Sequence, residues 1–85
     1  MNKPKLYGHE HADVYYPDNI HIWTNGGYSV DFFRDQNGNT KYLILREPGK
    51  RIQRAALNRW TAYAASKFAE IDTGNAIGGA HAAYG

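Results

Sequence analysis

Half of the basic side chains of this 85-residue protein lie in one short stretch of sequence. Residues 46–59 hold five of the ten lysines and arginines beside a single acid, namely Arg46, Lys50, Arg51, Arg54 and Arg59 with Glu47. Their local charge of +4 compares with a formal net charge of +2 for the whole chain. Lysine and arginine side chains bind phosphates and carboxylates. The stretch therefore predicts contact with an anion, and a nucleic acid and an acidic protein surface both remain open as its source.

The basic stretch coincides with the predicted start of a helix. Between Lys50 and Asp72 the apolar residues recur with a helical period and fall within an arc of about 160°, which predicts one amphipathic helix. Gly49 precedes it in place of a capping Ser, Thr, Asp or Asn, and cations in a first turn oppose the helix dipole. Unpaired N–H groups beside cations favour a bound anion. We therefore expect a partner to bind four side chains there: Lys50, Arg51, Arg54 and Arg59.

Aromatic residues on a predicted strand form a second candidate contact. Apolar and polar residues alternate along Asn19–Thr24, so His21 and Trp23 share the face opposite the isoleucines. Phe33, on the following strand, joins them on that face. Exposed aromatic residues are common in protein interfaces, and on a sheet they also stack unpaired bases. His21, Trp23 and Phe33 are thus predicted to bind a partner, unless the N-terminal segment folds over this face and buries it.

Turn signals divide the first half of the chain into strands. Asn-Gly pairs at 25–26 and 37–38 are typical of hairpins, and Pro48-Gly49 ends the last strand. Strands are expected at 19–24, 28–34 and 40–47, with a further short strand at 13–16. The predicted fold class is α+β, a three-stranded or four-stranded antiparallel β-meander packed on one long C-terminal helix. We expect an extended lead-in at 1–12, one domain at 13–73 and a flexible Gly/Ala-rich tail at 74–85.

Catalytic and metal-binding signals are weak. In an extended chain His9, His11 and Asp13 project the same way, as metal ligands would, with His21 as a fourth. The spacing matches no established metal site, and an exposed polar segment is the simpler interpretation. The chain has no cysteine, no phosphate loop and no G-x-S-x-G nucleophile motif. The sequence therefore predicts no cofactor, no metal and no enzymatic activity.

Nothing in the sequence indicates a membrane or an export signal. The longest apolar run, Leu43–Leu45, is far too short to cross a bilayer. The N-terminus lacks the apolar stretch of a secretory signal. The expected location is the cytoplasm.

The order of strands and helix resembles the plant-type and integrase-arm DNA-binding domains, which place a three-stranded sheet in the major groove. The resemblance implies that base-reading residues lie on the sheet face away from the helix. In this sequence those positions are His21, Trp23, Ser29, Asp31, Phe33, Lys41 and Leu43.

In size and style the chain also resembles small phage-encoded inhibitors, including anti-CRISPR proteins. This likeness implies a non-enzymatic protein that occludes a host protein or nucleoprotein complex in the host cytoplasm. The net charge of +2 favours it, because nucleic-acid-binding domains are usually more basic. The alternative is direct nucleic-acid binding, with Lys50, Arg51 and Arg54 on phosphates. A homodimer is a further expectation, since a short domain gains stability by burying exposed aromatics against a copy.

Overall fold

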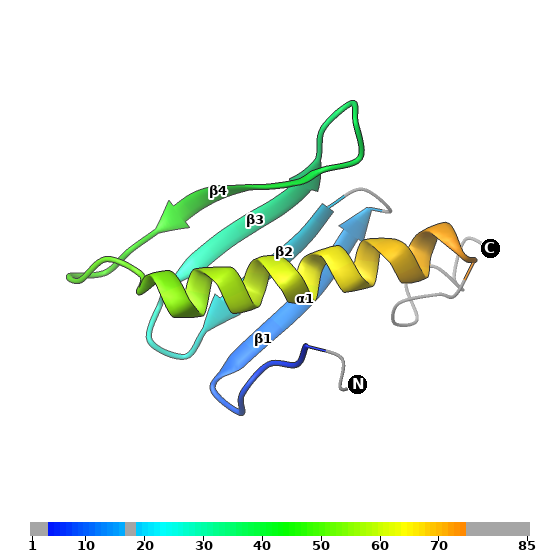
Figure 1. The fold of residues 1–85 in the computed structure, drawn as a ribbon. Coiled ribbons are helices and arrows are strands. Elements are labelled where there is room, and N and C mark those ends of the chain that lie inside the picture. Colours follow the sequence, from blue (N-terminus) through cyan, green and yellow to red (C-terminus); the bar gives the residue numbers. More distant parts are fainter. Residues whose placement is uncertain (1–3, 17–18, 75–85) are drawn as a thin grey trace.

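The computed structural model describes residues 4–16 and 19–74. It consists of four strands and one helix: β1 (Glu10–Tyr16), β2 (Asn19–Thr24), β3 (Ser29–Arg34), β4 (Thr40–Arg46) and α1 (Arg54–Asp72). The strands form one antiparallel sheet in chain order, and α1 crosses a single face of it (Figure 1). The predicted α+β meander is confirmed, in its four-stranded form.

The two hairpin turns form where the Asn-Gly pairs predict them. In the first, Gly27 takes a φ of +93°, and the Thr24 N–H donates to the Tyr28 carbonyl at 3.0 Å. In the second, Gly38 takes a φ of +83°, and the Asp35 carboxylate accepts two backbone N–H groups of the turn at 2.9 Å. Left-handed backbone favours glycine because a Cβ atom would be strained there. The turns fix the register in which β3 pairs with β2 and β4.

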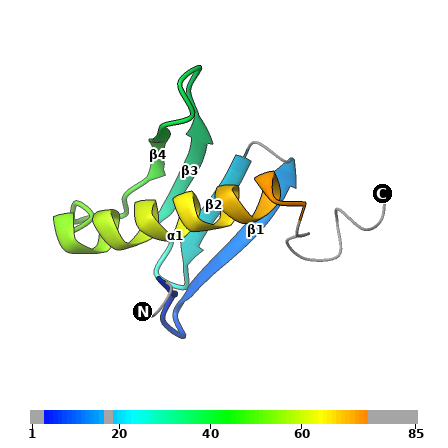
Figure 2. The ribbon, with the colours of Figure 1, turned by 45° about the vertical axis from the view of Figure 1, so that its right-hand side comes forward.

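The core lies between the sheet and α1. Strand alternation sends every second side chain of β2 and β3 toward the helix, where period-3.6 positions of α1 meet them. The buried apolar side chains that result are Ile20, Ile22, Val30, Phe32, Leu57, Trp60, Ala64 and Phe68. Figure 2 shows α1 on one side of the sheet, and no other described helix or strand covers the opposite side. We call that uncovered side the outer face.

The N-terminal segment enters the sheet earlier than predicted. β1 begins at Glu10 rather than at residue 13, so the end of the predicted lead-in at 1–12 belongs to the sheet. β1 pairs with β2 at the sheet edge, with Ala12 opposite Ile22 and Val14 opposite Ile20. These are core-facing positions, and Ala12 and Val14 pack against the core. The segment therefore extends the sheet instead of folding over the outer face.

The helix begins four residues later than predicted, at Arg54 instead of Lys50. Gly49 turns the chain with a φ of +88°, and the Glu47 carboxylate accepts the Ile52 N–H at 2.8 Å. This bond holds residues 50–53 outside the helix. At the other end α1 stops at Asp72, and the predicted capping glycine, Gly74, has a φ of +83°. Beyond Gly74, the predicted tail at 74–85 lies outside the described residues.

Candidate functional site

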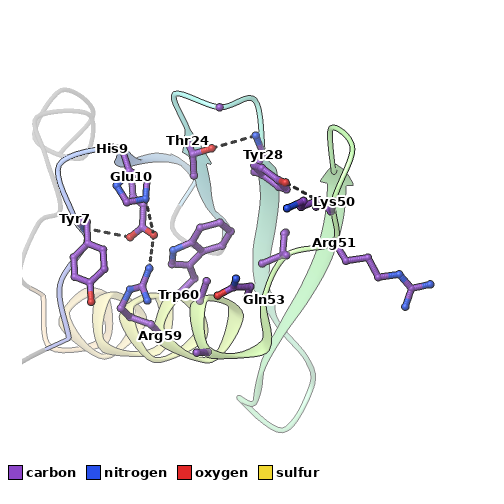
Figure 3. Close-up of a pocket in the computed structure, with 14 residues that line it drawn as sticks. Tyr7, His9, Glu10, Thr24, Tyr28, Lys50, Arg51, Gln53, Arg59 and Trp60 are labelled. Atoms are coloured by element: carbon purple, nitrogen blue, oxygen red, sulfur yellow. Dashed lines mark hydrogen bonds and ion pairs between the residues drawn. The ribbon is translucent and has the colours of Figure 1, made fainter.

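A pocket of about 450 Å³ opens where the start of α1 meets the β2–β3 hairpin and the N-terminal segment. Figure 3 shows three zones in it: Glu10 and Arg59 at one end, Trp60 in the middle, and Lys50 with Arg51 at the other end. Its volume is in the range that holds a small ligand or an anchoring side chain of a partner. The predicted basic cluster therefore borders a cavity, which the sequence did not predict.

One end of the pocket is closed by an ion pair between Glu10 and Arg59. The Glu10 side chain is only 1% exposed, and its Oε2 contacts Nη2 of Arg59. Its Oε1 accepts the Tyr7 N–H at 3.2 Å, and the Arg59 guanidinium lies over the Tyr7 ring at 4.2 Å. His9 Nε2 lies 3.7 Å from the same carboxylate. These contacts tie the N-terminal segment to α1.

The environment of Glu10 keeps its carboxylate charged. Burial raises the pKa of Glu10, but the Trp60 indole, the Tyr7 N–H and the Arg59 guanidinium together bring that pKa below its ordinary value. Trp60 Nε1 and Arg59 Nε are buried and have no hydrogen-bond partner within residues 4–16 and 19–74. Arg59 therefore has a counterion inside the protein, while its side chain stays 25% exposed at the pocket.

The middle of the pocket is apolar. Trp60 is 3% exposed and lies on the helix side, with Ile52 and Ala56 beside it. The Tyr28 hydroxyl donates to the Lys50 carbonyl at 2.9 Å and so fixes residues 50–53 against the hairpin. This arrangement offers an apolar surface between two charged ends.

The other end of the pocket has cations without an internal counterion. Lys50 and Arg51 line it, and Arg54 opens α1 beside it. We call these three side chains the basic rim. None of them forms an ion pair with any residue in 4–16 or 19–74. Figure 3 shows the Arg51 side chain extending away from the cavity.

The backbone at the start of α1, beside the basic rim, adds positive charge of its own. The residue before α1, Gln53, is extended and makes no side-chain capping bond. The first turn of the helix contains no acid. The helix dipole and the unpaired N–H groups therefore add to the positive potential of the rim.

The three aromatic site residues lie on the outer face, away from the pocket. Trp23 Nε1 donates to Asp13 at 3.0 Å, and its ring lies 4.4 Å from that of His11. His21 hydrogen-bonds with neighbouring side chains on both of its ring nitrogens. Phe33 is 36% exposed. The structure thus places the predicted site residues on two separate surfaces rather than in one site.

Through His21, side-chain hydrogen bonds connect Tyr15 to Ser29. Tyr15 Oη lies 2.9 Å from His21 Nδ1, and His21 Nε2 contacts Ser29 Oγ. A hydroxyl, an imidazole and an orienting group are the parts of a nucleophilic site. Ser29 lies inside the sheet, with Trp23 of β2 and Arg46 of β4 opposite it. These three side chains are best described as a polar network on the outer face.

The histidines and Asp13 considered as metal ligands do not converge in the described part of the chain. His11 hydrogen-bonds with Asn25 Oδ1 at 2.9 Å, and His9 is directed toward Glu10. Among residues 4–16 and 19–74, no three His, Asp or Glu side chains come close enough together to hold a metal ion.

Comparison with protein-family models, with curated proteins and with solved structures found no significant match to this chain. In the described part of the chain, no helix is both long enough and apolar enough to cross a membrane. Function must therefore be argued from the two surfaces described above.

Proposed function

We propose that the protein is a small non-enzymatic binding protein that occludes a host protein or nucleoprotein complex. Small phage-encoded inhibitors, including anti-CRISPR proteins, act in this way in the host cytoplasm, and the chain resembles them in size and style. The observation that carries the proposal is the pocket bordered by the basic rim. An apolar cavity beside unpaired cations is the arrangement that anchors protein partners.

The contact is proposed to have an apolar and an ionic part. An apolar side chain of the partner enters the middle of the pocket and packs on Trp60. Acidic side chains next to it bind Lys50, Arg51 and Arg54. The Glu10–Arg59 pair keeps its place and closes the far end, so it acts as a wall and not as a ligand.

The charge of the outer face favours a protein over a nucleic acid as partner. A sheet that lies in a DNA groove needs cations against the phosphates. In the described strands, two acids of the outer face, Asp13 and Asp31, accompany Lys41 and, opposite Ser29 at the end of β4, Arg46, so the face has no excess of cations. This departs from the DNA-binding domains that the strand order resembles.

Direct nucleic-acid binding by the basic rim is the second candidate, since three cations at a helix start suit phosphates equally well. A titration of duplex DNA over a range of salt concentrations tests it. Three phosphate contacts would give a log–log slope of about −2.7, roughly −0.9 per contact. We expect no measurable binding at low salt, and a slope near this value would instead establish the second candidate.

Affinity capture tests the proposed function itself. The protein is used as bait in a lysate of its native host, and retained proteins are identified by mass spectrometry. We expect one stoichiometric partner that the Arg51→Glu/Arg54→Glu variant releases. A partner retained equally by this variant would contradict the role of the basic rim.

A further inference from the structure

β4 exposes apolar side chains on both of its faces, and no strand formed by residues 4–16 or 19–74 lies on its outer edge. The sheet order places it at the end of the sheet, next to β3 alone. Leu43 and Leu45, on the outer face, are 57% and 54% exposed, and Tyr42 and Ile44, on the helix side, are 45% and 36% exposed. An exposed apolar edge strand is a template for pairing with another strand. Natural proteins usually protect such edges.

The backbone of the edge is also available for pairing. The Asp35 N–H donates to the Asn39 carbonyl at 3.0 Å, so these two residues form a hydrogen-bonded pair next to the turn. Hydrogen-bonded pairs alternate along an antiparallel ladder. Lys41 and Leu43 therefore bond toward β3, and the N–H and C=O groups of Tyr42 and Ile44 point to the open edge. A bulge beyond Ile44 ends this regular stretch.

We propose that β4 pairs with β4 of a second copy of this chain, antiparallel and centred on Leu43. The two sheets then join into one continuous sheet of eight strands, with both helices on the same side. A twofold axis through the interface makes the two contributions identical. This inference rests on the edge of β4 and does not depend on the pocket or on the proposed function.

The side chains of β4 favour a second copy in this register. Leu43 lies opposite itself, and Tyr42 lies opposite Ile44 twice, an aromatic–β-branched pair of the kind that stabilises sheets. Both cations of the strand face neutral residues, since Lys41 lies opposite Leu45 and Arg46 lies opposite Thr40. No like charges meet, so the strand is complementary to itself.

The neighbouring registers are less favourable. Centring the pair on Tyr42 places Lys41 opposite Leu43, and centring it on Ile44 places Arg46 opposite Tyr42. Neither of these registers contains the two Tyr42–Ile44 pairs of the register centred on Leu43. Leu43 is also the middle residue of β4, and its two neighbours, Tyr42 and Ile44, both lie before the bulge.

Disulfide trapping tests the register, because the chain has no cysteine of its own. Opposed residues in a non-hydrogen-bonded pair have Cα atoms about 4.5 Å apart, which a disulfide can bridge. Leu43 would form such a pair with its copy. We expect the Leu43→Cys variant to become a covalent dimer under mild oxidation at micromolar concentration.

Leu45→Cys is the matched control, since Leu45 lies on the same strand and face with nearly the same exposure. In the proposed register its two copies are separated by several residues along the strands, so it should remain unlinked. Equal linking of both variants, or of Leu45→Cys alone, would overturn the proposal. So would an unlinked Leu43→Cys chain.

Light scattering of the unmodified chain provides the second measurement. We expect twice the mass of one chain at micromolar concentration. Tyr42→Pro should give a monomer, because it removes an N–H directed to the open edge while the bonds to β3 remain. Its far-ultraviolet circular dichroism shows whether it is folded. Edge pairing would be contradicted by an unmodified chain that stays monomeric at every concentration, or by a folded Tyr42→Pro variant that is still a dimer. The first of these results is also the one expected if the edge pairs with a foreign protein instead.

Discussion

At the scale of single residues, the Glu10–Arg59 pair joins the start of β1 to α1. It connects a strand near the N-terminus to the C-terminal helix, 49 residues away in sequence. Burial of the carboxylate makes the pair depend on both partners, because either charge alone would lack a counterion. The pair therefore holds one wall of the pocket in place.

Replacing Glu10 by Gln should destabilise the protein by about 3 kcal/mol. This value is the lower end of the range for removing one partner of a buried ion pair, because Arg59 retains some exposure. Urea denaturation measures the change. The control is the Glu10→Leu/Arg59→Leu double variant, which removes both charges and should be less destabilised than Glu10→Gln. If the single variant were as stable as the unmodified protein, the pair would have no structural role.

The lowered pKa of Glu10 predicts the direction of the pH dependence. A carboxyl with a lower pKa in the folded state contributes stability above its unfolded value, which is ordinarily 4.5, and that stability is lost as pH falls below it. Asp35 acts in the same direction, because the backbone N–H of Asn39 lowers the pKa of its carboxyl.

Unfolding free energies measured from pH 6 down to pH 3 test this dependence. Glu10→Gln should flatten the decline below about pH 4.5 more than Asp35→Asn does, since Glu10 is buried and Asp35 is in an exposed turn. An unchanged decline in Glu10→Gln would show that other carboxyls cause it.

Of the two residues in this ion pair, only Arg59 gave a signal in the sequence. Arg59 lies at the border of the apolar arc of the helix, one turn from Ala56 and from Tyr63. A cation placed there needs an anion on the facing element. Glu10 gave no matching signal, because a polar residue before an alternating segment is ordinarily exposed.

At the scale of elements, the start of α1 is unfavourable for helix stability and favourable for an anion. Gln53 provides no cap, and Arg54 follows at the positive end of the dipole. Such local conflicts are more common at functional positions than elsewhere.

Replacing Gln53 by Asp should stabilise the protein by about 1 kcal/mol, because an N-cap carboxylate accepts helix N–H groups and complements the dipole. The same change should weaken partner binding, since it places an acid inside the basic rim. Thermal or urea denaturation and a binding titration measure the two effects.

Gln53→Ser is the control for this pair of effects. Serine caps the helix without adding a charge, so it should raise stability while affecting binding less than aspartate does. Equal affinities of the two variants would argue against an anion at the helix start.

The elements themselves followed from sequence where local signals agreed. The alternation in Asn19–Thr24 and the Asn-Gly turns predicted β2 and both hairpins, because these signals act within a few residues. The helix start was predicted too early because Glu47 bonds the Ile52 N–H and keeps the intervening residues out of the helix. Periodicity cannot detect a side chain that competes for a backbone group.

At the scale of the whole molecule, the protein has two layers and three surfaces with different properties. The outer face is polar and aromatic, the pocket end is basic, and the β4 edge is apolar. The sequence indicated the first two by residue type. The exposure of the β4 side chains depends on where α1 crosses the sheet, and local sequence patterns do not predict that position.

The proposed function requires the basic rim to bind an acidic surface of a protein partner. The most direct test is the dissociation constant of the captured partner for three chains. These are the unmodified protein, Arg51→Glu/Arg54→Glu, and Lys5→Glu/Lys67→Glu, and both variants change the net charge from +2 to −2. Lys67 makes a surface ion pair with Glu70, which is weak, and lies over the Tyr63 ring.

We expect the arginine variant to bind roughly tenfold or more weakly, a loss of about 1.4 kcal/mol or more, because reversed charges repel the partner's acids. The lysine variant should bind within a few-fold of the unmodified protein. Equal weakening in both variants would show an effect of net charge alone, and unchanged binding by the arginine variant would contradict the account.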